Sequence, residues 1–269
     1  MNQLVTSTRA SALAILTCSI ALGQAPNPAA YTRDLCVKVR DGKAAEYTSF
    51  LQDVTTKVAK VRMDAGIYSL FVIAQAVIPA GRAARCDYHL VYGSTGFPSE
   101  VPSAQQTAAD YKKAGIAMTA DQVAAKRNDL SYLVSTDIWR SRESVGGAVK
   151  GGYVRVNYYK TKPGATVADW IGMESTGWKP LAEAVAKDAP GMGWGVNSLA
   201  MPAGTSLAYN AMTVDFFPSW DALGKGIQTR AVWNKVHPNQ DMAAYTEKMA
   251  AIADRSRVDV LKLVEQMVK

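Results

Sequence analysis

The sequence predicts an α+β fold in which a chain of 269 residues contains two copies of one β-α-β-β-α-β unit. A row of short landmarks recurs in the same order roughly 120 residues later, which is typical of an internal duplication. The spacing of apolar residues in each copy predicts the same order of strands and helices. The paired landmarks are Asp-Ala-Gly at 64–66 and Asp-Ala-Pro-Gly at 188–191, Pro-Ala-Gly at 79–81 and 202–204, and Phe-Pro-Ser at 97–99 and 217–219.

In the first copy, alternation of apolar and polar residues predicts strands, and apolar residues three or four positions apart predict helices. Thr119 and Gln122 match a capping box, which marks the start of the second helix. The predicted elements are a strand at 35–39, a helix at 47–66, strands at 67–78 and 87–92, a helix at 119–128 and a strand at 130–139.

The second copy follows the same pattern. Thr166 can cap its first helix, and Pro180 predicts a kink or a break in it. The predicted elements are strands at 153–160, 192–201 and 207–216, with helical stretches after 166, 219 and 239. The last segment, 258–264, suits either a strand or a continuing helix.

A β-α-β-β-α-β unit is the ferredoxin-like split βαβ. Two such units in one chain resemble the dimeric α+β-barrel superfamily, which includes antibiotic-biosynthesis-type monooxygenases. The resemblance is one of topology, covers residues 33–267 and includes no family-specific catalytic motif. It implies that two ferredoxin-like repeats form one barrel within a single chain, with a cavity between their sheets. Two separate domains on a linker are the alternative.

The N-terminus has the features of a secretory signal: Arg9, a short apolar run at 10–22, and small residues at Ala21 and Gly23. An uncleaved membrane anchor is the alternative. We expect a signal peptide at 1–23, a flexible lead at 24–32, a first repeat at 33–140, a linker at 141–152 and a second repeat at 153–269. The mature protein is then periplasmic or secreted.

The sequence lacks the motifs of several common kinds of site. It has no H-E-x-x-H, C-x-x-C, G-x-S-x-G or P-loop motif, and only two histidines, His89 and His237. We therefore expect no metal and no cofactor. The net charge of +7 is spread over the chain without a basic block, so nucleic acid is not an expected partner, and neither is stable membrane insertion after signal removal.

The strand at 153–160 supplies most of the candidate ligand-binding residues. Val154, Val156 and Tyr158 are expected to face the helices, so the alternate residues would line the barrel, where Arg155 could pair with Asp137. A solvated or structural ion pair explains the same residues. Glu174 lies near the apolar stripe of its helix, at a pocket edge or in solvent. The candidates are Tyr153, Arg155, Asn157, Tyr159, Asp137, Trp139 and Glu174.

Two cysteines remain after signal removal, and an even pair in an exported protein predicts a Cys36–Cys86 disulfide. The first and third strands are neighbours in this topology, and parallel pairing would bring the two cysteines level. Strand parity then directs His89 to the helices. A disulfide and a catalytic or haem-ligating His89 in the barrel are thus competing hypotheses, and we favour the disulfide.

Three functions remain open from the sequence. The first is an exported protein that binds a small apolar or aromatic molecule between its sheets. The second is a cofactor-independent enzyme of the monooxygenase or isomerase type. The third is a structural or interaction module whose barrel is filled by side chains. A cavity larger than roughly 300 Å³ with converging polar groups favours the first two over the third.

Overall fold

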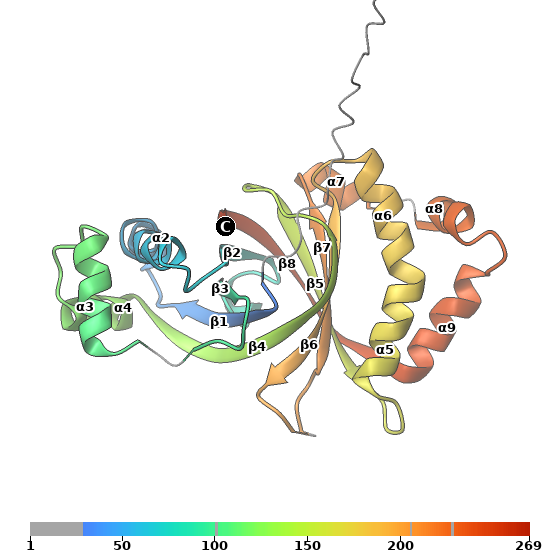
Figure 1. Cartoon of the computed structure of the whole chain (residues 1–269), viewed down its shortest axis with the longest axis horizontal. Coiled ribbons are helices and arrows are strands. Elements are labelled where there is room, and N and C mark those ends of the chain that lie inside the picture. The colour runs from blue at the N-terminus through green and yellow to red at the C-terminus, as the bar shows by residue number, and fades with distance from the viewer. Residues whose placement is uncertain (1–28, 100–101, 205, 227–228) are drawn as a thin grey trace, which may run out of the picture.

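The computed structural model describes residues 29–99, 102–204, 206–226 and 229–269. In this part of the chain the strands form one closed barrel in the order β1-β3-β2-β8-β5-β7-β6-β4 (Figure 1). The strands are β1 (Tyr31–Val39), β2 (Leu70–Ile78), β3 (Tyr88–Ser94), β4 (Ser131–Gly146), β5 (Tyr153–Thr161), β6 (Gly193–Met201), β7 (Ala211–Phe217) and β8 (Ala253–Val268). The undecided last segment is therefore a strand.

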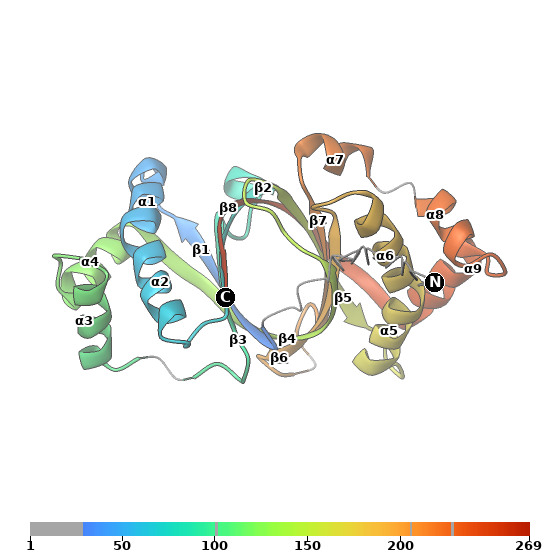
Figure 2. The same ribbon diagram turned by 45° about the horizontal axis from the view of Figure 1, so that its top comes forward.

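Helices cover the barrel in two groups on opposite sides (Figure 2). The first group is α1 (Ala44–Phe50), the π-helical turn η1 (Leu51–Thr56), α2 (Lys57–Asp64), α3 (Ala104–Lys113) and α4 (Ala120–Leu130), with a 3₁₀ turn η2 (Gly81–Ala83) before β3. The second group is α5 (Val167–Met173), the π-helical turn η3 (Glu174–Trp178), α6 (Lys179–Asp188), α7 (Trp220–Lys225), α8 (Thr229–Val236) and α9 (Met242–Ile252). None of these helices is long and apolar enough to cross a membrane.

The two halves repeat the same architecture, which confirms the predicted fold class. Each half has the ferredoxin-like strand order, β4-β1-β3-β2 in the first and β8-β5-β7-β6 in the second. β1 and β5 begin 122 residues apart, at Tyr31 and Tyr153, and the π-helical turns begin 123 residues apart, at Leu51 and Glu174. Equivalent positions of the two repeats can therefore be compared directly.

The two longest strands join the repeats into one barrel. β4 pairs with β1 over its first half and with β6 of the other repeat over its second half. β8 follows the same pattern, because it pairs first with β5 of its own repeat and then with β2 of the first repeat. Each repeat thus lends half a strand to its partner. This closes the sheet within one chain, as the single-barrel prediction requires, and leaves no independent domains on a linker.

Three apolar clusters fill the molecule. One lies between the helices and strands of the first repeat, a second between those of the second repeat, and a third inside the barrel. Side chains from both repeats occupy the interior of the barrel. The buried members of the interior cluster are Ala74, Trp139, Val154, Val156, Tyr158, Tyr209, Leu261 and Leu263.

The expected orientation of β5 was wrong. Val154, Val156 and Tyr158 point into the barrel, whereas Tyr159 packs with the helices of the second repeat. Alternation along a strand separates two faces but does not say which face is covered by which layer. Here both faces are buried, so apolar residues alone could not distinguish them.

Some expected boundaries also differ from the structure. β4 continues to Gly146, six residues into the expected linker at 141–152, because those residues pair with β6. β1 begins at Tyr31, within the expected flexible lead at 24–32. The expected signal peptide at 1–23 lies outside the described residues.

Candidate functional site

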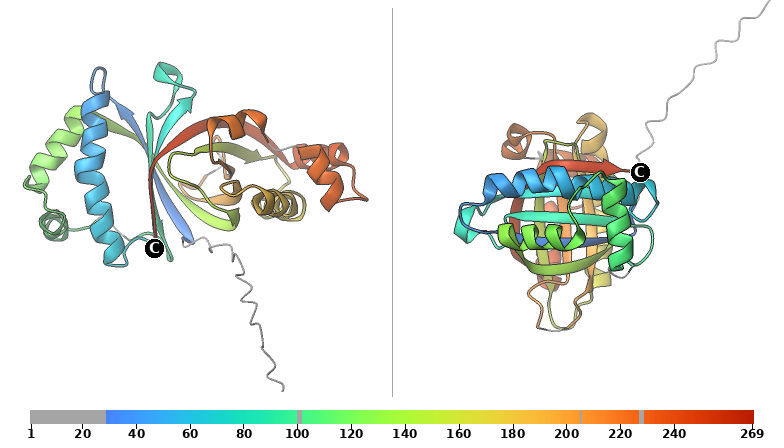
Figure 3. Two further views of the ribbon diagram at one scale, coloured as in Figure 1. Left: turned by 90° about the horizontal axis from the view of Figure 1, so that it is seen from above. Right: turned by 90° about the vertical axis from the view of Figure 1, so that its left-hand side faces the viewer.

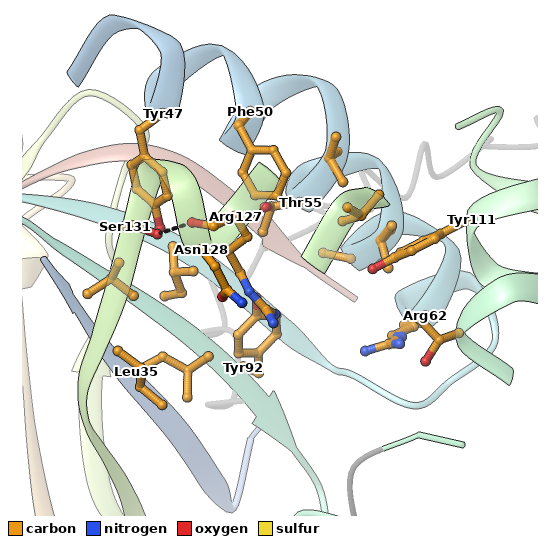
Figure 4. A pocket seen from close by; sticks show the side chains of 18 of the residues that line it. Leu35, Tyr47, Phe50, Thr55, Arg62, Tyr92, Tyr111, Arg127, Asn128 and Ser131 are labelled. Atoms are coloured by element: carbon orange, nitrogen blue, oxygen red, sulfur yellow. Dashed lines mark hydrogen bonds between the residues drawn. The ribbon is translucent and has the colours of Figure 1, made fainter. Parts of the chain in front are cut away.

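A cavity of about 400 Å³ lies in the first repeat, between its helices and the outer face of its sheet (Figure 4). Figure 3 shows these helices lying across the strands that form its floor. The cavity is lined by Leu35, Val37, Tyr47, Phe50, Val54, Thr55, Val58, Ala59, Arg62, Tyr68, Leu90, Tyr92, Pro102, Thr107, Tyr111, Val123, Arg127, Asn128, Ser131, Tyr132 and Leu133.

Local sequence explains why this wall is apolar. The helix formed by α1, η1 and α2 carries its apolar residues at helical spacing, and Tyr47, Phe50 and Val54 are buried on its inner side. Its π-helical turn lies beside the cavity, and such turns are frequent at functional sites. The floor consists of alternate residues of β1 and β3, among them Leu35 and Leu90. The cavity therefore suits an apolar or aromatic molecule.

The two arginines that line the cavity differ in their surroundings. Arg62 is engaged: its Nε lies 2.8 Å from Asp110 Oδ2, and its Nη1 donates to the Tyr68 hydroxyl at 3.2 Å. Asp110 is also held by Gln106. Among the described residues, the guanidinium of Arg127 forms no hydrogen bond or ion pair, and only its backbone carbonyl accepts a bond, from Ser131 Oγ.

Five tyrosines line the cavity, and the burial of two of them, Tyr47 and Tyr92, shifts their pKa. Burial raises the pKa of Tyr47 to about 12, although Ser131 beside its hydroxyl lowers it in part. Burial likewise raises the pKa of Tyr92, while the nearby Arg62 and Arg127 oppose the shift. Both phenols are therefore protonated at neutral pH and can act as hydrogen-bond donors, and the Tyr47 hydroxyl already has Ser131 as a partner.

None of the seven ligand-binding candidates from the sequence lines this cavity. They fall into two other places: Asp137 and Trp139 lie in the barrel, and Arg155, Asn157, Tyr159 and Glu174 lie around the helix–sheet interface of the second repeat. Tyr153 packs edge-on against Trp220 at the end of β5. The expected pairing of Arg155 with Asp137 is wrong, because the two side chains lie on opposite faces of the sheet.

The cavity residues carried a signal that sequence reasoning used only for secondary structure. The apolar stripe that begins at Tyr47 and Phe50 was interpreted as a helix packed against a core. A stripe of this kind does not show whether the opposing sheet fills the space beneath it. Only the packing of the whole layer reveals the cavity.

The polar cluster of the second repeat is built around Asp215. Arg155 Nε lies 3.0 Å from Asp215 Oδ2, and Asn157 Nδ2 donates to the same oxygen at 2.9 Å and to Thr213 Oγ1 at 3.1 Å. Glu174 is 3% exposed, and within the described residues its carboxyl forms no hydrogen bond or ion pair. Burial raises the pKa of Glu174 well above its usual value, and the charge of Asp215 adds to the shift.

A second polar network lies inside the barrel. His89 Nδ1 donates to Asp34 Oδ2 at 2.9 Å, and Asp34 lies opposite Asp137 on the neighbouring strand. The Tyr209 hydroxyl donates to Asp137 Oδ2 at 2.6 Å and accepts from Arg85 Nη1 at 2.9 Å. Burial alone lowers the pKa of His89, but Asp34 outweighs burial and raises it overall. The network satisfies its own members and lies away from the cavity.

The predicted Cys36–Cys86 disulfide is confirmed, with the two Cα atoms 5.2 Å apart. The expected strand geometry was wrong, however, because β1 and β3 are antiparallel and Cys36 lies opposite His89. Cys86 precedes β3, so strand alternation does not extend to it. Consequently His89 shares the barrel face with Cys36, and the disulfide does not exclude it from the interior.

Comparison with known proteins places the fold and little else. No protein-family model and no curated protein matches the sequence. A candidate monooxygenase from Lactobacillus acidophilus NCFM matches with a TM-score of 0.55 and 11% identity, over 88% of this chain and 95% of that one. A haem-binding protein from Thermus thermophilus matches with a TM-score of 0.48 and 10% identity, over 90% and 96% of the two chains.

A further match, a candidate monooxygenase from Fusobacterium nucleatum, has a TM-score of 0.48 and 11% identity over 90% of this chain and 95% of that one. At 11% identity, the match with a TM-score of 0.55 shows the fold alone. Together with the closed barrel of two repeats, it shows that the chain has the dimeric α+β-barrel fold, with both ferredoxin-like repeats fused in one polypeptide. The resemblance expected from topology is confirmed at this level.

The cavity does not fit a histidine-ligated haem. Neither histidine of the chain reaches it: His89 lies in the barrel, and His237 lies 2.9 Å from the backbone oxygen of Gly177 in the second repeat. Within the described residues, no group of three His, Cys, Asp or Glu side chains could hold a metal ion. The chemistry available at the cavity is binding by apolar contact, with phenol and guanidinium donors at its wall.

Proposed function

We propose that the protein binds a small, mostly apolar or aromatic molecule in the cavity of the first repeat. The observation that carries this proposal is a space of about 400 Å³ within a layer whose equivalent in the other repeat is packed. Ligand sites typically have volumes of roughly 300 to 1,000 Å³ and a mostly apolar lining with a few polar groups. The binding site is thus moved from between the sheets, where side chains fill the barrel, to the outside of the first sheet.

The experiment is a binding measurement with a cavity-filling variant. Ala59 is buried on α2 and lines the cavity, so Ala59→Phe places a ring inside it. We expect the wild type to bind a neutral fluorescent probe such as N-phenyl-1-naphthylamine and to carry a small molecule detectable by native mass spectrometry. A folded Ala59→Phe variant should lose both. Unchanged binding in that variant would place the ligand elsewhere.

An enzyme of the monooxygenase or isomerase type is the second candidate, suggested by the described activity of the Lactobacillus match. It differs from the first in requiring turnover of the bound molecule. Oxygen uptake and product mass measured with the co-purified ligand distinguish the two. Release of the ligand unaltered supports a binding protein.

We also propose that the protein is exported to the periplasm or beyond. The Cys36–Cys86 disulfide supports this, because structural disulfides persist in oxidising compartments. N-terminal sequencing of the processed protein should give a chain that begins near Gln24, with no free thiol after unfolding without reductant. An intact Met1 on membrane-bound protein would contradict export by cleavage.

A further inference from the structure

We propose that the molecule bound in the cavity of the first repeat is an organic anion, with an apolar body inside the cavity and one acidic group at Arg127. This inference rests on the proposed binding function and names the chemical class of the ligand. It follows from the charge of the lining, the donors near the rim, and the contrast with the second repeat.

The lining of the cavity in the first repeat, within the described part of the chain, carries positive charge and no acidic side chain. It contains two arginines and no Asp or Glu among the described residues. Asp110 forms an ion pair with Arg62, with 2.8 Å between Asp110 Oδ2 and Arg62 Nε. Of the two arginines in the lining, Arg127 is therefore the one whose guanidinium has no anionic partner among the described residues. Two arginines elsewhere form ion pairs with buried carboxylates, Arg155 with Asp215 and Arg257 with Asp259. Arg127 is exposed, so its guanidinium is reachable from solvent at the rim of the cavity, where an anion from outside the chain would form a charge-assisted pair with it.

The neighbouring groups are also suited to an acidic group. Figure 4 shows the Arg127 side chain extending from α4 toward Tyr92, with Asn128 beside it. The charge of Arg127 acts on both Tyr47 and Tyr92, whose hydroxyls are donors at neutral pH. Guanidinium, amide and phenol donors together favour a carboxylate, sulfonate or phosphate oxygen over a neutral acceptor.

The equivalent place in the second repeat shows that the arginine is not required by the fold. The position 122 residues after Arg127 is Met249, which is buried and accepts a hydrogen bond from Trp178 Nε1 at its sulfur. The position equivalent to Tyr92 is Asp215, an acid instead of a donor. The cationic rim is therefore a property of the repeat that has the cavity.

The test compares two probes that share one aromatic body and differ in charge. They are 8-anilinonaphthalene-1-sulfonate, an anion, and N-phenyl-1-naphthylamine, which lacks the sulfonate. We expect Arg127→Gln to weaken the anionic probe about tenfold, because a charge-assisted hydrogen bond is lost at a partly solvated rim. Binding of the neutral probe should not change. Arg127→Lys, which keeps the charge, should recover part of the affinity.

Lys126→Gln is the matched control, since it removes the same charge from the adjacent residue of α4, which does not line the cavity. It should leave both probes unaffected. Equal losses for Lys126→Gln and Arg127→Gln would reduce the effect to overall charge and overturn the proposal. An Arg127→Gln variant that binds each probe as tightly as the wild type does would also overturn the proposal. Failure of the neutral probe to bind, or its retention by Ala59→Phe, would instead contradict the binding function itself.

Discussion

The helix–sheet layers of the two repeats occupy equivalent places in one barrel but are built from different side chains. Leu51 of the first repeat corresponds to Glu174 of the second, Leu35 to Asn157, and Tyr92 to Asp215. Both Leu51 and Glu174 are almost completely buried, with exposed fractions of 2% and 3%. The same backbone therefore holds an apolar wall in one repeat and a buried polar cluster in the other.

The two layers also differ in side-chain volume, which is larger in the second repeat at the position equivalent to Thr55. Thr55 lies beside the cavity on the first π-helical turn, and its equivalent on the second turn is Trp178, which packs against Trp233. The second layer also buries Trp170 completely. Aromatic side chains of the second layer thus occupy places where the first layer has a smaller side chain beside its cavity. The comparison teaches that two repeats of one topology can have helix–sheet layers that differ in side-chain volume and polarity.

The largest effect is expected from separating the repeats. A fragment of residues 24–146 loses the partner strands β6 and β8 and exposes the barrel face of its sheet. Exposed apolar sheet faces and unpaired edges promote association. We expect this fragment to aggregate or to form dimers, measured by size-exclusion chromatography with light scattering. A stable monomeric fragment would show that the repeats fold independently, and would contradict the statement that they form one barrel.

Exchanging the buried residues of the two π-helical turns tests whether the layers tolerate each other's chemistry. Leu51→Glu places a carboxyl at a position that is 2% exposed within the apolar cluster of the first repeat, so we expect the free energy of unfolding to fall by about 3 kcal/mol or more at neutral pH. Urea denaturation measures it. Leu51→Met is the control for packing alone and should cost less than about 1.5 kcal/mol. Equal losses for the two variants would mean that the polarity of the wall does not matter.

A smaller effect should distinguish the open layer from the packed one. Ala59 and Ala182 are equivalent buried residues of α2 and α6, at 1% and 5% exposure. Ala182→Leu should destabilise the protein by about 1 to 3 kcal/mol, because extra volume in a packed layer forces strain. Ala59→Leu enters the cavity and should change stability by less than about 0.5 kcal/mol. Thermal melts of both variants decide it, and equal losses would argue that the cavity is not open.

The smallest effect concerns Glu174 and its pH dependence. Its folded-state pKa is raised, so the folded protein binds the proton more tightly than the unfolded chain does. The resulting stabilisation is complete below the unfolded pKa of about 4.3 and is lost as pH rises through the folded pKa. Glu174→Gln keeps a neutral side chain and removes this titration.

Relative to wild type, Glu174→Gln should therefore gain stability between pH 5 and pH 8, by about 1.4 kcal/mol for each pKa unit of the shift covered. Chemical denaturation at these two values measures the difference. Asp169→Asn, on the same helix but exposed, is the control and should show no comparable gain toward high pH. A constant difference between wild type and Glu174→Gln across this range would mean that Glu174 has an ordinary pKa.

Local features of the chain were predictable because short-range chemistry determines them. Thr119 with Gln122 forms the predicted capping box, and Thr166 caps α5 as expected, since each cap satisfies backbone donors within one turn. The order of strands and helices followed from periodicity and from the repeated landmarks. The disulfide followed from the number of cysteines and from the neighbouring strands of the split βαβ unit.

The sites depended on contacts between elements far apart in the sequence. Burial of Glu174 was one of two possibilities for a residue at the edge of an apolar stripe, and the packing of the helix–sheet layer of the second repeat decided it. The placement of Arg155 and Asn157 under the helices, with Asp137 in the barrel, depended on which of two apolar faces the second sheet would cover. Alternation has the same period on both faces and cannot distinguish them.

The sequence by itself determined the two ferredoxin-like repeats, most of the elements within each, and the cysteines that pair, because these follow from local periodicity, caps and residue counts. Only the tertiary structure decided that β4 and β8 are shared between the repeats, that the barrel is filled, and that a cavity remains under the helices of one repeat. The physical reason is that cavity volume is the difference between the space enclosed by packed layers and the side chains that enter it. That difference depends on the side chains that pack around Thr55 and Trp178 in the folded protein, and the spacing of these residues in the sequence does not reveal it.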